Sequence, residues 1–261
     1  MASQDIRTIT TTEELADFCA LAKQQPYVTL DTEFLRERTY WSKLCLIQLA
    51  LPPASTPKAA GGEAVLVDPL AEGLSLEPLY DLFRHTATVK VFHAARQDLE
   101  IFFHDAGIFP DPLFDTQIAA MVAGFGDQVS YDSLCRALAG VTIEKAHRFS
   151  DWAARPLSAS QIAYAAADVT HLRLVYTALR DRLSREGRLE WVAEEMAALA
   201  DPAAYRAEPE SAWERLKPRT QNRRALGVLR AAAAWREREA QRVNVPRQRL
   251  VRDETLMELA A

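Results

Sequence analysis

Two carboxylates share one face of a predicted strand. In the segment YVTLDTEF, the period-two alternation of a strand places Thr29, Asp31 and Glu33 on one face and apolar residues on the other. Neighbouring carboxylates in a mostly buried strand repel each other and lose hydration, so they require a compensating cation. The spacing is therefore compatible with a metal site. The alternative is an edge strand whose acids are solvated.

A third carboxylate, Asp98, lies in VFHAARQDLEIF, near the start of the helix that follows a predicted strand at 89–92. In open sheets, sites form where loops leave the carboxyl ends of strands, and Asp98 is near such an end. The alternative is an ordinary first-turn aspartate that interacts with the helix dipole. We interpret His93, five residues earlier, as structural.

Tyr164 and Asp168, in QIAYAAADVTHL, are four residues apart on a predicted helix and therefore lie on one face. An aspartate among small apolar residues on a core-facing helix stays ionised only near a cation, and the surrounding alanines leave room for one. Tyr164 on its own is more typical of a core tyrosine than of a catalytic one.

The elements that must position these side chains alternate between strands and helices. Three consecutive strands followed by β-α alternation predict a mixed sheet covered by helices. Strands are predicted at 27–34, 44–49, 64–67 and 89–92, and helices at 12–23, 76–83, 96–105, 117–123, 131–138 and 159–185.

Length and composition indicate an ordinary globular protein. The chain has 261 residues, 49% of them apolar, and a formal net charge of -5, which suggests one large domain or one domain with a small module. No stretch is apolar enough to cross a membrane, and the polar start is unlike a signal peptide, so we expect a cytoplasmic protein. Three scattered cysteines and five histidines form no zinc motif.

The modest net charge hides a division along the chain. Residues 201–261 contain thirteen Lys and Arg against nine Asp and Glu, whereas residues 1–200 contain eighteen against twenty-seven. The two prolines of DPAAYRAEPE, at 201–209, mark a boundary, and helices are predicted beyond it at 211–216, at 220–240 and from Asp253. An acidic body with a basic tail suggests a polyanionic partner, and a solvated helix face is the alternative.

Taken together, the motifs resemble the tyrosine-bearing subclass of the DEDD exonuclease superfamily and, more narrowly, the ribonuclease D family. The first motif is LDTEF, followed by LRERTYWSKLCLIQLA; the second is HAARQDLEIF and the third is YAAADVTHL, with FDTQIAA and FSDWAARPLS between them. Five segments in order over residues 27–180 make the resemblance specific. The tail is similar to the first helices of an HRDC domain, a helical nucleic-acid-binding module, and stops before its later helices.

The resemblance implies a ribonuclease H-like mixed sheet of five strands with helices on both faces, gathering the acids at one edge of the sheet. It divides the chain into an exonuclease domain at 1–200, a linker at 201–209 and a partial HRDC-like module at 210–261. It also implies two divalent cations, Mg²⁺ or Mn²⁺. The carried-over roles are metal binding and catalysis for Asp31, Glu33, Asp98 and Asp168, and water orientation for Tyr164. The candidates for substrate binding are Phe34, Gln48, Lys145 and Arg148, with core packing as the alternative for Phe34 and Gln48.

The implied activity is that of a 3′-to-5′ exoribonuclease that releases nucleoside 5′-monophosphates, with tRNA 3′ maturation as the expected role. The expected partner is RNA with a single-stranded 3′ end, with no membrane and no obligate protein partner. A DNA 3′-5′ exonuclease of the same superfamily and a noncatalytic RNA-binding protein are the alternatives.

Overall fold

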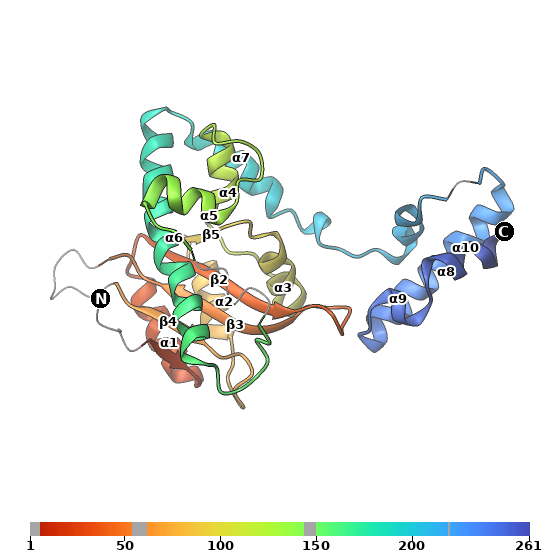
Figure 1. Ribbon diagram of the computed structural model, residues 1–261, viewed down its shortest axis with the longest axis horizontal. Helices are drawn as coiled ribbons and strands as arrows, with labels where there is room; N and C mark the ends of the chain where they lie inside the picture. The colour runs from red at the N-terminus through yellow and green to blue at the C-terminus, as the bar shows by residue number, and fades with distance from the viewer. Residues whose placement is uncertain (1–5, 54–61, 144–149, 219) are drawn as a thin grey trace. The chain divides into compact units, whose positions relative to one another are not determined.

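The computed structural model describes residues 6–53, 62–143, 150–218 and 220–261, which form two compact units (Figure 1). The first unit comprises Met1–Phe34 and Leu44–Asp201, and the second comprises Leu35–Lys43 and Pro202–Ala261. The second unit therefore combines the C-terminal helices with the connection that follows the strand of Asp31 and Glu33.

A mixed sheet forms the centre of the first unit. Its strands are β1 Arg7–Ile9, β2 Tyr27–Leu35, β3 Lys43–Ala50, β4 Ala64–Val67, β5 Val89–Phe92 and β6 Leu113–Asp115, in the order β1-β4-β3-β2-β5-β6. The pairs β1/β4, β2/β5 and β5/β6 are parallel, and β3/β4 is antiparallel. The sheet has six strands rather than the predicted five. The sequence did not indicate β1 and β6, because three residues are too few to show a strand alternation.

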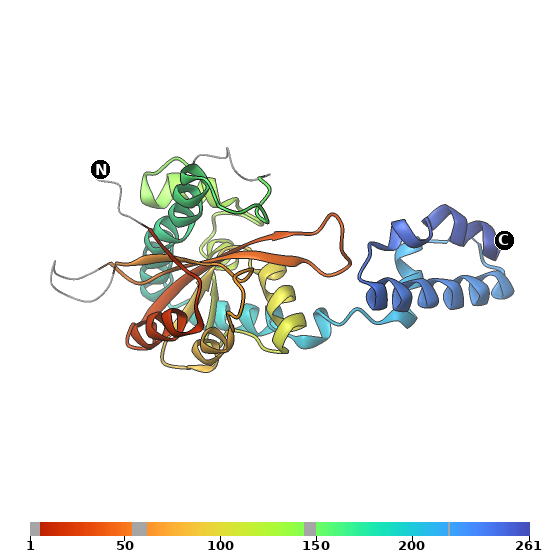
Figure 2. The same cartoon turned by 90° about the horizontal axis from the view of Figure 1, so that it is seen from below.

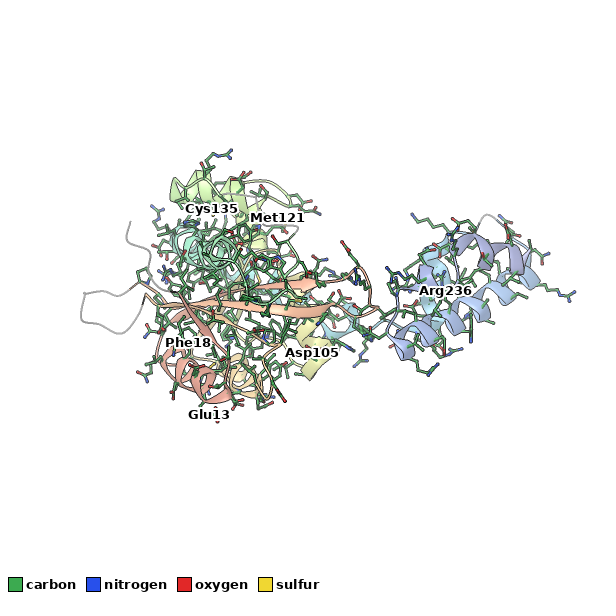
Figure 3. The ribbon with its side chains drawn as sticks, turned by 60° about the horizontal axis from the view of Figure 1, so that its bottom comes forward. Glu13, Phe18, Asp105, Met121, Cys135 and Arg236 are labelled. Carbon is green, nitrogen blue, oxygen red and sulfur yellow. The ribbon has the colours of Figure 1, made fainter. Side chains whose placement is uncertain are left out.

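Helices cover both faces of this sheet, as predicted. They are α1 Thr12–Ala22, α2 Glu77–Arg84, α3 Arg96–Ala106, α4 Thr116–Val122, α5 Tyr131–Leu134, α6 Ala159–Arg185 and α7 Leu189–Leu199. Figure 2 shows α6 on one face and α1 with α2 on the other. The labelled side chains of Cys135 and Phe18 lie in these two opposite layers (Figure 3). None of the helices in the described ranges is long and apolar enough to cross a membrane.

Local sequence signals explain where the long helix α6 begins. Ser158 and Gln161 form a capping box, in which each side chain contacts the backbone of the other residue, so two unpaired amides of the first turn are satisfied. The buried residues Ala165, Val169 and Leu172 then follow helical spacing and face the sheet side. The predicted bounds of this helix, 159–185, are confirmed.

Other helix predictions needed correction. The helix predicted at 131–138 is α for only four residues and continues as a π-helical turn, Cys135–Ala139, which ends at Gly140 with a positive φ of 65°. The helix α7 was not predicted.

The second unit is helical apart from its loops. Its helices are the 3₁₀ segments Pro202–Ala204 and Pro209–Leu216, then α8 Arg223–Val243, α9 Arg247–Leu250 and α10 Asp253–Ala260. The predicted helix at 211–216 is thus a 3₁₀ helix, and α9 was not predicted. The helix predicted from 220 begins at Arg223, because the Asn222 side chain caps it by accepting from the amides of Arg224 and Ala225. Ala212, Leu229, Ala233 and Leu256 form a small core.

Candidate active site

A cavity of about 480 Å³ in the first unit is lined by most of the predicted site residues. Asp31 comes from β2, Asp98 from the first turn of α3 and Asp168 from α6. Tyr164, one helical turn before Asp168, and Phe34, near the end of β2, also line it. The fold therefore brings three segments that are distant in the sequence to one cavity.

The acids lie in the interior of the sheet and not at its lateral edge. The strand β2, which carries Asp31 and Glu33, stands between β3 and β5. Its register with β5 pairs Thr29 with Val91, so the two acids follow the last paired residue of β2 in that register. The expectation of acids at one edge is therefore wrong in detail: Asp31 and Glu33 lie within β2 beyond its pairing with β5, and Asp98 follows the carboxyl end of β5, where sites of open sheets form.

Burial raises the pKa values of the carboxylates, and neighbouring acids raise some of them further. Burial, followed by the charge of Asp168, raises the pKa of Asp31 to about 8. Burial raises the pKa of Asp168 to about 7, although a hydrogen bond with Tyr164 lowers it. The pKa of Asp98 lies well above its usual value because of burial and the charge of Asp31. The three groups therefore form one electrostatically coupled cluster of negative charge.

Glu33 belongs to the same electrostatic cluster although it does not line the cavity. Burial raises its pKa to about 9, and the charges of Asp31, Asp168 and Asp98 each raise it further. We refer to Asp31, Glu33, Asp98 and Asp168 as the carboxylate cluster.

The chemistry of the carboxylate cluster fits divalent cations. Among the described residues, no three His, Cys, Asp or Glu side chains are already arranged around one point as metal ligands. Carboxylates repel one another while no cation lies between them, which favours such a spread. All the donors are oxygen atoms, the ligands that Mg²⁺ and Mn²⁺ prefer, and burial gives a bound cation little competition from water. The donor set therefore suits these ions better than zinc.

Two hydroxyl groups that the sequence did not single out hold the acids in place. The Thr32 hydroxyl donates to Oδ1 of Asp98, which links β2 to α3. The Tyr131 hydroxyl donates to the backbone carbonyl oxygen of Asp168. Both contacts join segments far apart in the chain, so no local spacing could reveal them.

A fifth acid, Asp115, positions the turn before α3. Its carboxylate accepts from the amides of Ala94 and Ala95 at 3.0 and 2.8 Å, and from that of Gln117 at 2.7 Å. It therefore caps α4 and also holds the turn in which Ala94 has a positive φ of 55°. This residue lies in the segment FDTQIAA, but no role was predicted for it.

The phenol of Tyr164 stays protonated in this setting, because burial and the charges of Asp168, Glu33 and Asp31 raise its pKa. The Trp152 ring lies 6.0 Å from the Tyr164 ring and is buried. Arg155 anchors this segment by donating to Asp68 from Nε at 2.6 Å and from Nη2 at 2.7 Å. The wall beside Tyr164 is therefore firmly attached to the sheet.

The four predicted substrate-binding residues have different outcomes. Phe34 lines the cavity and is half-buried. Gln48 is fully buried and lies outside the cavity lining, and its amide has no hydrogen-bond partner among the residues that the structure describes. Because Gln48 is buried in this structure, a contact between its side chain and a nucleotide stays a prediction. Lys145 and Arg148 lie outside the described residues.

Comparison with protein families matches two segments of the chain. The model of a 3′-5′ exonuclease matches residues 6–184, and that of the HRDC domain matches residues 225–261. Ribonuclease D of Gluconacetobacter diazotrophicus is 62% identical over 253 residues, which cover 97% of this chain and 62% of that relative. The chain therefore spans less than two thirds of the relative's length.

Solved structures agree with this assignment. The crystal structure of Escherichia coli RNase D, described as an exoribonuclease involved in structured RNA processing, has a TM-score of 0.89 at 34% identity and covers 98% of this chain and 66% of its own. Brucella melitensis NrnC with bound Mg²⁺ has a TM-score of 0.59 at 28% identity and covers 74% of this chain and 87% of its own. The exonuclease match takes in more than half of the sequence, and the likeness to ribonuclease D that the motifs indicated is confirmed. The chain belongs to the 3′-5′ exonuclease family.

Proposed function

We propose that the protein is a metal-dependent 3′-to-5′ exoribonuclease that releases nucleoside 5′-monophosphates from RNA. The observation that carries this proposal is the carboxylate cluster, whose pKa values are raised by burial and, for Asp31, Glu33 and Asp98, also by neighbouring acids, beside a cavity that Tyr164 also lines. Membership of the exonuclease family and the likeness to ribonuclease D support the choice of an exonuclease and of RNA.

Asp31, Glu33, Asp98 and Asp168 would hold two divalent cations, Mg²⁺ or Mn²⁺, which when bound supply activation of water and stabilisation of the leaving oxygen. The NrnC structure, which contains Mg²⁺, supports metal dependence. Bound cations would stabilise the ionised carboxylates, because positive charge offsets the repulsion between them.

The other residues hold the reactants. Tyr164 keeps its proton on Oη and can hold the attacking water by a hydrogen bond, so it need not ionise during the reaction. As the water oxygen forms a bond to the phosphorus and gives up a proton, the bond from phosphorus to the 3′ oxygen breaks and that oxygen takes up a proton, which leaves a mononucleotide and a new 3′-hydroxyl. Phe34 on the cavity wall offers a face on which the terminal base can stack.

The remaining assignments are proposed on charge and on likeness. We assign residues 1–200 to the exonuclease domain, 201–209 to a linker and 210–261 to a partial HRDC-like module that binds RNA. From the sequence alone, we also assign Lys145 and Arg148 to substrate binding. The excess of Lys and Arg beyond residue 200 supports an RNA-binding role. Trimming of tRNA precursors in the cytoplasm is the expected physiological role.

The proposal is tested by digestion of a single-stranded RNA that has a free 3′ end and carries a label at its 5′ end. The wild-type chain should shorten the RNA from its 3′ end in Mg²⁺ and release 5′-monophosphates, and EDTA should stop the reaction. Tyr164→Phe should retain part of the rate, because only the orientation of the water is lost. A rate equal to that of the wild type would refute the role of Tyr164.

The same assay separates the alternatives. A matched DNA strand digested faster than RNA would identify a DNA exonuclease. Binding of RNA with no release of mononucleotides would identify a noncatalytic RNA-binding protein.

A further inference from the structure

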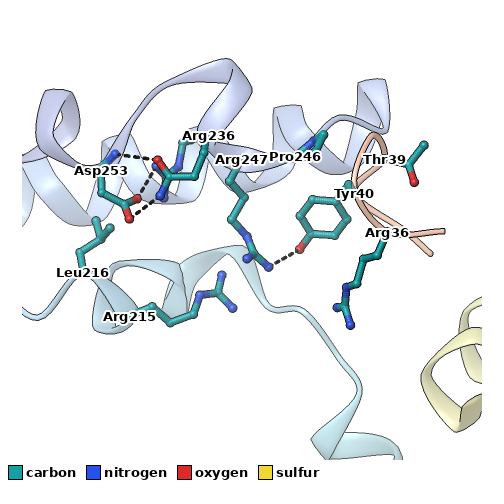
Figure 4. A pocket seen from close by; sticks show the side chains of 10 residues that line it. Arg36, Thr39, Tyr40, Arg215, Leu216, Arg236, Pro246, Arg247 and Asp253 are labelled. Atoms are coloured by element: carbon teal, nitrogen blue, oxygen red, sulfur yellow. Dashed lines mark hydrogen bonds and ion pairs between the residues drawn. The ribbon is translucent and has the colours of Figure 1, made fainter. Parts of the chain in front are cut away.

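The second unit contains a hollow of about 260 Å³ that gathers arginine side chains (Figure 4). Arg36 comes from the Leu35–Lys43 connection, Arg215 from the 3₁₀ segment Pro209–Leu216, and Arg247 from α9. We call these three residues, with the hollow that they line, the arginine pocket. Arg236 and Asp253 also line it, and the two form an ion pair at 2.7 Å.

A buried carboxylate pairs with two arginines of the arginine pocket. Glu237 on α8 is fully buried; its Oε1 lies 2.9 Å from Nη2 of Arg215, and its Oε2 lies 2.7 Å from Nε of Arg247. The Tyr40 hydroxyl also donates to Oε1. Although burial opposes ionisation, the hydrogen bonds from Tyr40 and Arg247 keep the pKa of Glu237 below its usual value. The carboxylate therefore orients both guanidinium groups in the pocket.

Charge in the pocket is positive overall. Two guanidinium groups, those of Arg215 and Arg247, share the single negative charge of Glu237, while Arg236 and Asp253 neutralise each other. Arg36, from the connecting segment, also lines the hollow. Because a guanidinium group has five N–H donors in a fixed plane, contact with one carboxylate leaves donors that can bind a second anion.

Exposure allows an anion to reach these donors. The Arg215 and Arg247 side chains retain 50% and 38% of their solvent exposure, whereas Glu237 retains none. The polar side chains of Thr39 and Gln248 complete the lining. A preformed pocket of guanidinium groups held by a buried acid is the arrangement that binds phosphate groups with two parallel hydrogen bonds.

We propose that the arginine pocket binds a phosphate group of the RNA backbone. The assignment to RNA rests on the proposed function, and the chemistry of the pocket is that of any phosphate monoester or diester. A free mononucleotide, the product of the reaction, is the other source of such a group.

Binding measurements on the full 261-residue chain test the proposal. The protein carries Asp31→Asn and Asp168→Asn and is kept in EDTA, so that RNA stays intact. The probes are a single-stranded RNA, adenosine 5′-monophosphate and inorganic phosphate. The variants are Arg215→Gln and Arg247→Gln, and the matched control is Arg249→Gln, which removes the same charge from an exposed position of α9 outside the pocket.

Each pocket variant should weaken RNA binding by about tenfold at low salt relative to Arg249→Gln. The slope of log K against log salt should flatten by about 0.7, the value of one lost single-strand phosphate contact. Affinities and slopes equal to those of Arg249→Gln would overturn the proposal. A loss confined to adenosine 5′-monophosphate would also overturn it, since the pocket would then serve the product.

A second measurement guards against misfolding, since Arg247 contacts the buried Glu237. In the chain with all its arginines, inorganic phosphate should shift the side-chain ¹⁵N resonances of Arg215 and Arg247 saturably and leave that of Arg249 unchanged. Equal, non-saturating shifts of all three would refute the pocket. A failure of the proposed hydrolysis is detected separately with the wild-type chain in Mg²⁺, because RNA binding in EDTA does not require hydrolysis.

Discussion

The carboxylate cluster and the arginine pocket both collect like charges, yet they differ in how those charges are compensated. Burial and mutual repulsion dominate the four acids, and the pKa values of Asp31 and Glu33 reach about 8 and about 9. In the arginine pocket, Glu237 lies between two guanidinium groups, and its pKa is lowered instead of raised.

The difference separates a site that needs its ligand from one that is formed before its ligand arrives. Repulsion within the carboxylate cluster persists until cations bind, so cation binding and stability of the first unit are linked. The arginine pocket already contains the acid that orients its donors, so an added anion completes it without rearrangement.

Loss of one acid should have the largest effect. Asp31→Asn should reduce the rate of RNA hydrolysis at least about a thousandfold, because a cation ligand worth several kcal/mol to the transition state is removed. Asp17→Asn, an exposed aspartate on α1, is the matched control and should keep the wild-type rate. Similar rates for both variants would remove the carboxylate cluster from the mechanism.

The next effect is a dependence of stability on pH in the metal-free protein. The folded acids hold protons up to pH values of about 7 for Asp168, about 8 for Asp31 and about 9 for Glu33, whereas unfolded acids lose them near pH of about 4. Between these limits the folded state binds more protons, so the free energy of unfolding falls as the pH rises. The expected slope is about 1.4 kcal/mol per pH unit for each extra proton.

Urea unfolding in EDTA from pH 5 to pH 9 measures this slope for the protein. Hydrogen exchange of the β2 amides over the same pH range measures it at the strand that carries the acids. Added Mg²⁺ should stabilise the protein most at the high-pH end, where the acids are ionised. Asp31→Asn with Asp168→Asn should flatten the dependence. A stability that rises across this range would contradict the interpretation of the cluster.

Removing the central acid of the arginine pocket should have a smaller effect. Glu237→Gln should lower the opening free energy of the α8 amides by about 1 to 2 kcal/mol, because both arginine partners keep part of their contact with water. Hydrogen exchange of α8 gives this value. The control Glu239→Gln breaks an exposed pair with Arg242 and should change it by less than about 0.5 kcal/mol. Equal effects would mean that Glu237 is not a structural centre.

The smallest effect concerns an acid–arginine pair in the first unit. Asp68→Asn should lower the stability of the first unit by about 1 kcal/mol, since Arg155 still donates to the carbonyl oxygens of Cys45 and Trp152. Because those contacts keep the Trp152 segment attached, the rate of hydrolysis should fall by less than about threefold. A loss as large as that of Asp31→Asn would assign Asp68 a role in the reaction.

Local pattern was sufficient for the central elements of the first unit. Apolar residues at helical spacing predicted α6, and β-branched and apolar runs indicated β2 to β5. The strands β1 and β6 were missed because each has three residues and depends on pairing with β4 and β5, which is tertiary information.

The candidate site shows the same limit. Asp31, Asp98, Tyr164 and Asp168 were predicted from residue type and order, and they meet at one cavity. The burial of Gln48 could not be predicted, because a polar residue in a strand gives no sign of what covers it. The Leu35–Lys43 connection also read as an ordinary loop, yet Tyr40 and Trp41 donate their amides to Oδ1 of Asn244, about two hundred residues away.

One hydrogen bond between uncharged groups ties together the two elements that carry Asp31 and Asp168. The buried hydroxyl of Thr29 donates to the carbonyl oxygen of Val169 at 2.8 Å, which ties β2 to α6. Thr29 shares a strand face with Asp31, and Val169 follows Asp168 directly. The hydrogen bond between two uncharged groups thus keeps Asp31 and Asp168, which repel each other, on neighbouring elements. Both groups of this hydrogen bond are uncharged, so it ties β2 to α6 whatever the charge of the neighbouring acids.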